Sequence, residues 1–240
     1  MIHCVSTMNK DYYDTIGIVM INSWAQCFPD NYVLHLYLED FDIKKVKHPR
    51  IVYEDWNEVA ELYKIWESTR GSSNSRHQKF TLKALSQICA WRKFQTGKML
   101  WLDADLLFLK PVPNNMFDNV LEDYAIAAWG DQCFESGTVW FNLDHKDFTK
   151  VKDIYESIYI GERNLPENQR WYDGEILGWS VNEANIRFKK LQDFYNIKKS
   201  STPLNKSPLG VYMQHFKAKR KNHLKESLLA YGRKDLADLL

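Results

Sequence analysis

Residues 98–109 read KMLWLDADLLFL, in which Asp103 and Asp105 stand between two runs of four apolar residues. The first run predicts a strand that is buried on both faces, as the central strands of parallel sheets are. In extended chain the side chains at i and i+2 point to one side, so the two carboxylates can share one ion. A divalent cation is the usual compensation for carboxylates flanked by buried segments. We therefore predict that Asp103 and Asp105 bind a metal.

The spacing alone is not specific, because the chain holds a second such triplet, Asp40-Phe41-Asp42. That copy follows Glu39 and precedes Ile43-Lys44-Lys45, a composition typical of a solvated turn. The first copy instead follows a strand, and open α/β sheets bind ligands at the carboxyl ends of their strands. This context favours Asp103 and Asp105 over the second copy.

Strands and helices alternate on the N-terminal side of this stretch. Strand patterns occupy 2–7, 32–38 and 50–54, and helical patterns occupy 12–27, 57–68 and 76–95. The alternation predicts an α/β fold with a doubly wound, mostly parallel sheet. On the C-terminal side we expect strands at 124–129, 138–143, 187–191 and 211–216, and a helix at 148–159.

Composition narrows the function. The net charge of +1 argues against a globally basic nucleic-acid binder. The four cysteines include no Cys-x-x-Cys pair, which disfavours a structural zinc site or a disulfide framework and favours a cytoplasmic protein. No apolar run approaches the length of a membrane span, so we expect a soluble protein with no membrane partner.

Charge is uneven along the chain. Residues 187–225 hold eleven Lys or Arg and one acidic residue, Asp193, which predicts a surface for an anionic partner. Helical spacing then continues through Leu224, Leu228, Leu229, Leu236 and Leu240, so we predict a basic helical C-terminal tail.

Residues 96–107, TGKMLWLDADLL, resemble the Asp-x-Asp segment of glycosyltransferases with the GT-A fold, especially glycosyltransferase family 8 and its relatives. Residues 5–10 resemble the first strand and nucleotide-binding loop of that fold, and residues 136–142 resemble the strand under the donor sugar. The resemblance implies a metal-dependent enzyme that transfers a hexose from a nucleotide diphosphate sugar, with UDP as the nucleotide, to a hydroxyl with retention of configuration. Two features depart from family 8: Gly174 replaces a Gln, and Phe216 to Lys221 replaces a Gly and Lys-Pro-Trp segment.

The resemblance also assigns residues. It implies that His215 completes the metal shell, and a His ligand favours Mn²⁺ over Mg²⁺ because imidazole is softer than carboxylate. It implies catalytic roles for Asp173 and Glu175 near the transferring sugar. The candidates for donor binding are Ser6, Thr7, Met8, Tyr12, Ser136 and Gly137, together with the cations Arg76, Lys79, Lys83, Lys217 and Lys219.

We expect one domain over residues 1–240, with a nucleotide-sugar-binding half at 1–105, an acceptor half at 106–216 and a basic C-terminal helix at 217–240. The acceptor stays open between a saccharide, a lipid-linked or protein hydroxyl, and a hydroxymethylated pyrimidine in DNA, such as bacteriophages carry. A sugar-nucleotide or nucleic-acid binding module without turnover is the alternative class.

Three other enzyme classes are disfavoured. A haloacid dehalogenase-type phosphatase needs Thr or Val where Leu107 stands. A glycosidase needs two carboxylates about 5 to 10 Å apart on separate elements. A nicotinamide enzyme needs a glycine-rich loop after the first strand, where Ser6 to Asn9 contains no glycine.

Overall fold

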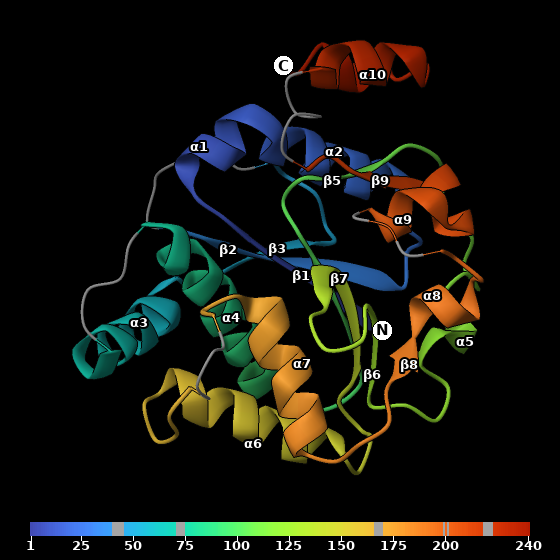
Figure 1. The fold of residues 1–240 in the computed structure, drawn as a ribbon. Coiled ribbons are helices and arrows are strands. Elements are labelled where there is room, and N and C mark those ends of the chain that lie inside the picture. The colour runs from blue at the N-terminus through green and yellow to red at the C-terminus, as the bar shows by residue number, and fades with distance from the viewer. Residues whose placement is uncertain (40–45, 71–74, 166–169, 199, 201, 218–222) are drawn as a thin grey trace.

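The computed structural model describes the chain except residues 40–45, 71–74, 166–169, 199, 201 and 218–222. A seven-stranded sheet in the order β3-β2-β1-β4-β7-β6-β8 forms its centre, with helices on both faces (Figure 1). The strands are β1 (Ile2–Met8), β2 (Tyr32–Leu38), β3 (Ile51–Glu54), β4 (Lys98–Leu102), β6 (Ile126–Trp129), β7 (Glu135–Asn142) and β8 (Lys189–Lys190). The first four in the chain run parallel, and β7 runs antiparallel to β4 and β6. The predicted α/β sheet is confirmed.

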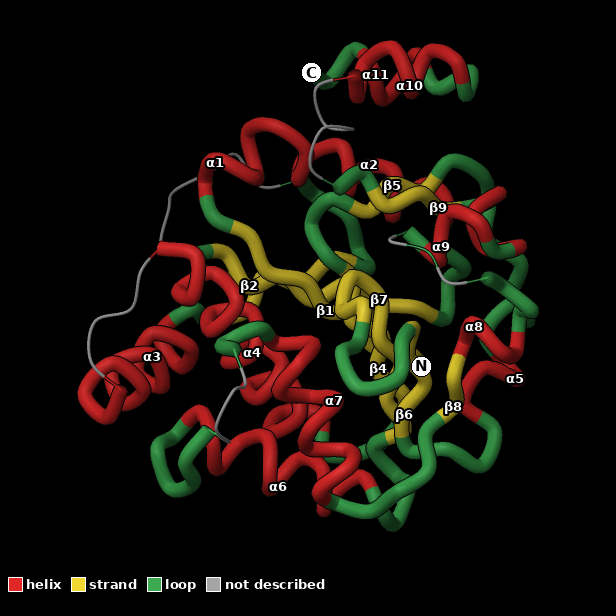
Figure 2. Tube along the Cα trace, viewed as in Figure 1, coloured by secondary structure: helices red, strands yellow, loops and turns green. Residues whose placement is uncertain are grey.

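Two short strands, β5 (Leu106–Phe108) and β9 (Met213–His215), form an antiparallel pair outside the central sheet (Figure 2). The helical segments are α1 (Lys10–Tyr12), a π-helical turn (Tyr13–Gly17), α2 (Ile18–Cys27), α3 (Asn57–Arg70), α4 (Ser75–Phe94), α5 (Asp118–Leu121), α6 (Phe148–Tyr159), α7 (Asp173–Glu183), α8 (Leu191–Phe194), α9 (Pro203–Lys206), a 3-10 turn (Pro208–Val211), α10 (Leu224–Ala230) and α11 (Lys234–Ala237).

Strand β4 is buried on both faces, as its apolar run predicts. Met99 and Trp101 pack into the core on the side of α3, α4, α6 and α7. Leu100 and Leu102 point to the opposite core, under α2. None of the four is more than 1% exposed, and burial of a side chain of this size stabilises a fold by about 1.5–3 kcal/mol. This strand therefore fixes the direction in which the chain emerges at Asp103.

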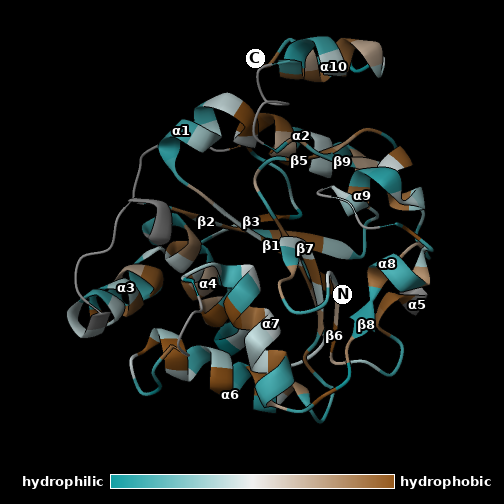
Figure 3. Ribbon diagram, viewed as in Figure 1, coloured by the Kyte–Doolittle hydropathy of each residue, from teal (hydrophilic) through white to brown (hydrophobic). Residues whose placement is uncertain are grey.

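The helices that cover the sheet are amphipathic, and Figure 3 shows both hydrophilic and hydrophobic residues along each of them. In α6 the buried residues Val151, Tyr155 and Ile158 recur at helical spacing. In α4 the apolar residues at helical spacing are Ala84, Leu85, Ile88 and Trp91, which are buried, and Phe80, which is half-buried. These two helices pack against one face of the sheet and fix the direction of the side chains that α4 sends toward the end of β4.

The C-terminal segment is helical, as predicted, but it is divided. Gly232, with φ of 73°, separates α10 from α11, so the single helix expected over 217–240 is not formed. Of the predicted apolar series, Leu224, Leu228 and Leu236 are buried, whereas Leu229 and Leu240 are exposed. Helix α11 packs against α2. No helix in the described part of the chain is both long enough and apolar enough to span a membrane.

Candidate functional site

The β5–β9 pair brings Asp105 and His215, which are 110 positions apart in sequence, close together. Leu106 of β5 pairs with His215 of β9, and the Phe216 amide donates to the Asp105 carbonyl at 2.9 Å. Asn205 fixes His215 further, because its side chain accepts from the His215 amide at 2.7 Å and donates to its carbonyl at 3.1 Å. The imidazole is therefore held beside the segment that follows β4.

Asp103, Asp105 and His215 converge into a group with metal-ligand geometry. One ligand atom from each lies within 4.8 Å of the others. His215 Nε2 lies 2.8 Å from Asp105 Oδ1 and 3.8 Å from Asp103 Oδ2. Two carboxylates and one imidazole suit Mn²⁺, and Mg²⁺ with more water in its shell. The donor set fits a divalent cation.

The backbone geometry behind this pairing differs from the one we expected. Asp103 and Asp105 lie in a turn rather than in extended chain, because β4 ends at Leu102 and the Leu106 amide donates to the Asp103 carbonyl at 3.1 Å. The prediction from strand alternation was wrong on this point. The turn and β9 together, rather than alternation alone, bring both carboxylates to His215. The second triplet, Asp40-Phe41-Asp42, lies outside the described residues.

Lys83 links the first aspartate to α7. Its Nζ lies 2.6 Å from Asp103 Oδ1 and 2.9 Å from Asp173 Oδ2. It also donates to the carbonyl and hydroxyl of Ser136 at 2.8 and 3.0 Å. Burial acts to lower the pKa of Lys83, but the two carboxylates outweigh it and hold that pKa above its usual value. Lys83 is therefore a buried cation that joins three of the predicted site residues.

Asp173 begins α7, where the helix dipole favours a carboxylate. It is 2% exposed. Glu175 is also buried but turns to Arg170, whose guanidinium and backbone amide both donate to it. Asp173 therefore contacts the cluster around Lys83, whereas Glu175 bonds Arg170 in the segment that precedes α7.

Glu135 was missed by the sequence analysis. Its Oε1 lies 3.4 Å from His215 Nδ1, and Lys217 Nζ donates to the same oxygen. Burial acts to raise the pKa of Glu135, but His215 and Lys217 lower it to about 2. A lone acidic residue at the start of a strand carries no signal of its own. The adjacent Ser136-Gly137 pair was the nearest clue.

Gly137 makes room for the imidazole. A Cβ at this position would lie 2.2 Å from His215 Cε1 and 2.6 Å from Nδ1. Its carbonyl accepts from the Asp103 amide at 2.9 Å. Burial acts to lower the pKa of His215, but Asp105 and Glu135 raise it to about 9. Ser136 and Gly137 thus both contact the cluster, one through Lys83 and the other through His215.

The predicted donor-binding residues at the N-terminus lie along the same edge of the sheet. Val5 of β1 pairs with Trp101 of β4, so the parallel strands carry Thr7 toward the edge where Asp103 emerges. The Ser6 hydroxyl is buried and has no hydrogen-bond partner among the described residues, and the Thr7 hydroxyl donates to the Tyr37 carbonyl. The side chains of Met8 and Tyr12 pack against the core under α2.

Three of the other four predicted cations lie apart from the cluster or have no described side chain. Lys79 is exposed and lies over the ring of Phe80 at 5.1 Å. Arg76 belongs to α4, but its side chain is not among the described ones, and Lys219 falls outside the described residues. Lys217 lies in the cluster through Glu135.

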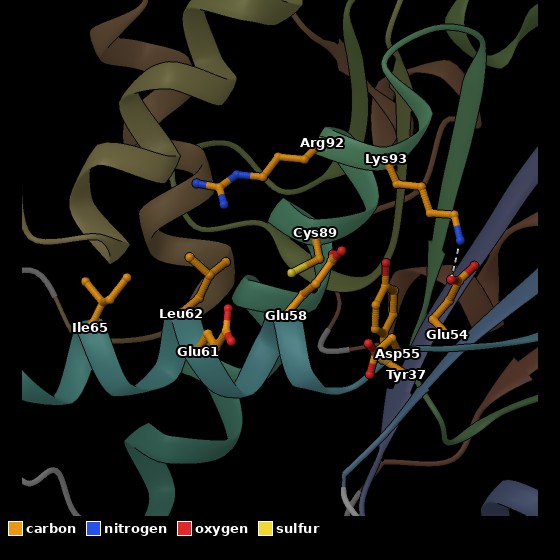
Figure 4. Close-up of a pocket in the computed structure, with 10 residues that line it drawn as sticks. All are labelled: Tyr37, Glu54, Asp55, Glu58, Glu61, Leu62, Ile65, Cys89, Arg92 and Lys93. Carbon is orange, nitrogen blue, oxygen red and sulfur yellow. Dashed lines mark hydrogen bonds and ion pairs between the residues drawn. The ribbon is translucent and has the colours of Figure 1, made fainter.

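A large cavity lies elsewhere, between α3, the C-terminal half of α4 and strands β2 and β3 (Figure 4). Its volume is about 620 Å³, and Glu54, Asp55, Glu58 and Glu61 line it, together with Arg92 and Lys93. Four carboxylates against two cations repel a diphosphate. An anionic donor therefore fits the edge at Asp103 better than this cavity.

Comparison with known proteins identifies the fold. No protein-family model matches the sequence, and no curated protein matches it. Solved structures do match. The galactosyltransferase LgtC, in complex with donor and acceptor sugar analogues, aligns with a TM-score of 0.56 and 15% identity over 99% of this chain and 94% of its own.

Two further structures agree. Mouse xyloside xylosyltransferase 1 aligns with a TM-score of 0.54 and 13% identity over 79% of this chain and 85% of its own. The glycosyltransferase GlyE of Streptococcus pneumoniae aligns with a TM-score of 0.55 and 14% identity over 99% of this chain, which spans 61% of GlyE. The chain has the fold of GT-A glycosyltransferases, as predicted.

Proposed function

We propose that this chain is a metal-dependent glycosyltransferase that transfers a hexose from a nucleotide diphosphate sugar, most directly a UDP-sugar, to a hydroxyl acceptor. The observation that carries the proposal is the convergence of Asp103, Asp105 and His215 at the carboxyl end of β4. Open α/β sheets bind ligands at this edge, and the GT-A fold supports the donor class. The family resemblance further implies retention of the anomeric configuration, which NMR of the fresh product measures.

The roles follow from the chemistry of each group. Asp103, Asp105 and His215 would hold Mn²⁺ or Mg²⁺, and the bound ion would stabilise the negative charge that grows on the leaving diphosphate. Lys83 holds the carboxylates of Asp103 and Asp173 at fixed positions. Asp173, next to that lysine, is proposed to accept hydrogen bonds from hydroxyls of the donor sugar. Glu175 lies in the same first turn of α7 and is proposed to take part through its ion pair with Arg170.

The cluster has a charge that suits one divalent ion. Asp103, Asp105, Glu135 and Asp173 face Lys83 and Lys217. Binding of a metal would release the extra proton of His215, and with the neutral imidazole the group keeps two negative charges, which one divalent cation balances. An ion that is also open to the donor can then accept diphosphate oxygens as further ligands.

A donor screen tests the proposal. Purified protein is incubated with UDP- and GDP-sugars, with Mn²⁺, with Mg²⁺ and with chelator, and sugar release and unfolding temperature are measured. We expect release and stabilisation with one sugar nucleotide and only with metal. Stabilisation without release, even with a panel of acceptors, would favour the non-catalytic binding module. If no donor gives either sugar release or stabilisation, the proposed function is contradicted.

The acceptor needs a separate experiment. The exposed Lys225 and its basic neighbours motivate the DNA hypothesis, since an extended phosphate backbone releases many counterions when bound. DNA binding is measured against salt for the wild type and for a variant with Ala at Arg220, Lys221 and Lys225. Salt-sensitive binding that the variant loses supports a DNA acceptor. Its absence favours a saccharide or other small acceptor.

A further inference from the structure

His215 is held from both of its ring nitrogens. Nε2 faces Asp105 at 2.8 Å, on the side where the ligand atoms converge. Nδ1 faces Glu135 at 3.4 Å, on the opposite side of the ring. Gly137 lets the ring approach β7 closely, because any Cβ there would overlap the imidazole. One nitrogen thus points to the proposed ion and the other to a carboxylate.

This arrangement has a chemical consequence for metal binding. A histidine binds a metal through a nitrogen that carries no proton, so Nε2 must be free and Nδ1 must hold the hydrogen. A carboxylate that accepts from Nδ1 favours that tautomer, fixes the ring and makes Nε2 a better ligand. Carboxylate partners of this kind commonly change metal affinity about 10- to 100-fold.

Glu135 is itself oriented for this role. Lys217 donates to Oε1, the oxygen that faces the imidazole, and the Gly137 amide lies 3.4 Å from the same oxygen. Its Oε2 is buried with no hydrogen-bond partner in the described part of the chain. Among the described residues only Asp103, Asp105 and His215 offer atoms that converge for an ion. Glu135 therefore contacts the proposed ligand His215 and is not itself one of the residues that converge for the ion.

We infer that Glu135 is a positioning residue that orients His215 for metal binding, with Lys217 holding Glu135. The inference rests on the metal site of the proposed function and deepens it. Glu135→Gln keeps the shape and a neutral acceptor but loses the charge, whereas Glu135→Leu removes the acceptor altogether. The two changes therefore predict graded losses of metal affinity rather than one common loss.

The experiment measures Mn²⁺ binding by electron paramagnetic resonance on donor-free protein, with Asp105→Asn as the ligand-loss reference. Glu156→Gln is the matched control, because Glu156 has a similar exposure, 15% against 13%, and a basic partner, Arg92. We expect affinity to fall several-fold for Glu135→Gln and about 10- to 100-fold for Glu135→Leu, and to stay unchanged for Glu156→Gln. Unfolding temperature in chelator separates this effect from a loss of fold.

A spectroscopic readout covers the case in which Glu135→Leu folds poorly. Long-range ¹H–¹⁵N spectra of Mg²⁺-loaded protein report which nitrogen of His215 carries the hydrogen. We expect it on Nδ1 in the wild type and a mixture in Glu135→Gln. Wild-type affinity and tautomer in Glu135→Gln, with affinity lost in Asp105→Asn, would overturn the positioning role and leave the proposed function intact. If metal affinity falls in steps across the Glu135 variants but the wild type releases sugar from no donor, the positioning role stands and the proposed function is overturned. If the wild type does not bind Mn²⁺, both are overturned.

Discussion

Asp105 lies in a turn, and its backbone carbonyl accepts a hydrogen bond from the Phe216 amide. Its carboxylate contacts the His215 imidazole, so both its backbone and its side chain are fixed beside β9. We predict that Asp105→Asn lowers sugar transfer at least about a hundredfold, as loss of a major electrostatic contact of the transition state does. The amide keeps the volume but loses the charge that binds a cation. Transfer rates at saturating Mn²⁺ measure the effect. Asp147→Asn, a change at a carboxylate paired with Lys150, is the control and should leave transfer unchanged.

Gly137 offers a test of shape alone. In Gly137→Ala the added methyl group overlaps the imidazole, so His215 must turn away from β7. We predict that the Mn²⁺ concentration for half-maximal transfer rises about tenfold or more, as changes around a metal ligand do. Titration of activity with Mn²⁺ measures it. An unchanged metal requirement would mean that His215 is not a ligand.

The residues of the site were predictable to different degrees. Asp103 and Asp105 could be predicted from the sequence, because charged residues between apolar runs need a compensating partner. Lys83 was expected as one of several cations for donor binding, since periodicity does not tell which turn of a helix points into a site. Glu135 carried no signal, because its role depends on a histidine 80 positions away that folding brings close.

Among the elements, β1 carries a pH-sensitive contact. His3 Nδ1 lies 3.1 Å from His35 Nε2, and the His3 ring stacks on Phe94. Burial and the nearby His35 lower the pKa of His3 to about 4. The unfolded chain, with an ordinary pKa near 6.5, binds a proton more readily, so stability is complete above about pH 6.5 and falls as the pH drops toward 4.

We therefore predict that His3→Gln loses less stability than the wild type between pH 7 and pH 5. The difference should be about 1 kcal/mol, allowing for partial exposure of the ring. Urea unfolding at the two pH values measures it. Equal losses in the two proteins would show that His3 does not titrate in this range on unfolding.

The elements themselves were predicted best where one pattern dominates. Strand β2 and helix α6 were expected at 32–38 and 148–159, and both occur with those bounds. Strand β7 was expected to begin at Thr138 but begins at Glu135, since the polar start hides the strand period. Pairing was harder, because nothing local in Leu106–Phe108 tells that its partner is Met213–His215.

At the scale of the whole molecule, Arg233 fastens the C-terminal helices to the body. Its guanidinium donates to the carbonyls of Phe108 and Leu109 at 2.9 and 3.3 Å, and it bonds Asp235. We predict that Arg233→Ala lowers the free energy of unfolding by about 1–3 kcal/mol, because buried carbonyls lose their donor. Urea unfolding measures the loss. The exposed neighbour Lys234→Ala should change stability by no more than about 0.5 kcal/mol.

The pairing of β5 with β9 also sets an order of events during synthesis. A nascent chain that has passed Asp105 carries both aspartates but lacks the histidine, which follows 110 residues later. Closing a loop of that length costs about 4 kcal/mol of chain entropy. The turn around Asp105 is therefore not stabilised in its final geometry until His215 has been synthesised. The metal site can therefore be completed only after the strands of the central sheet have been synthesised. A polypeptide interrupted before residue 215 would hold much of the sheet and no complete site.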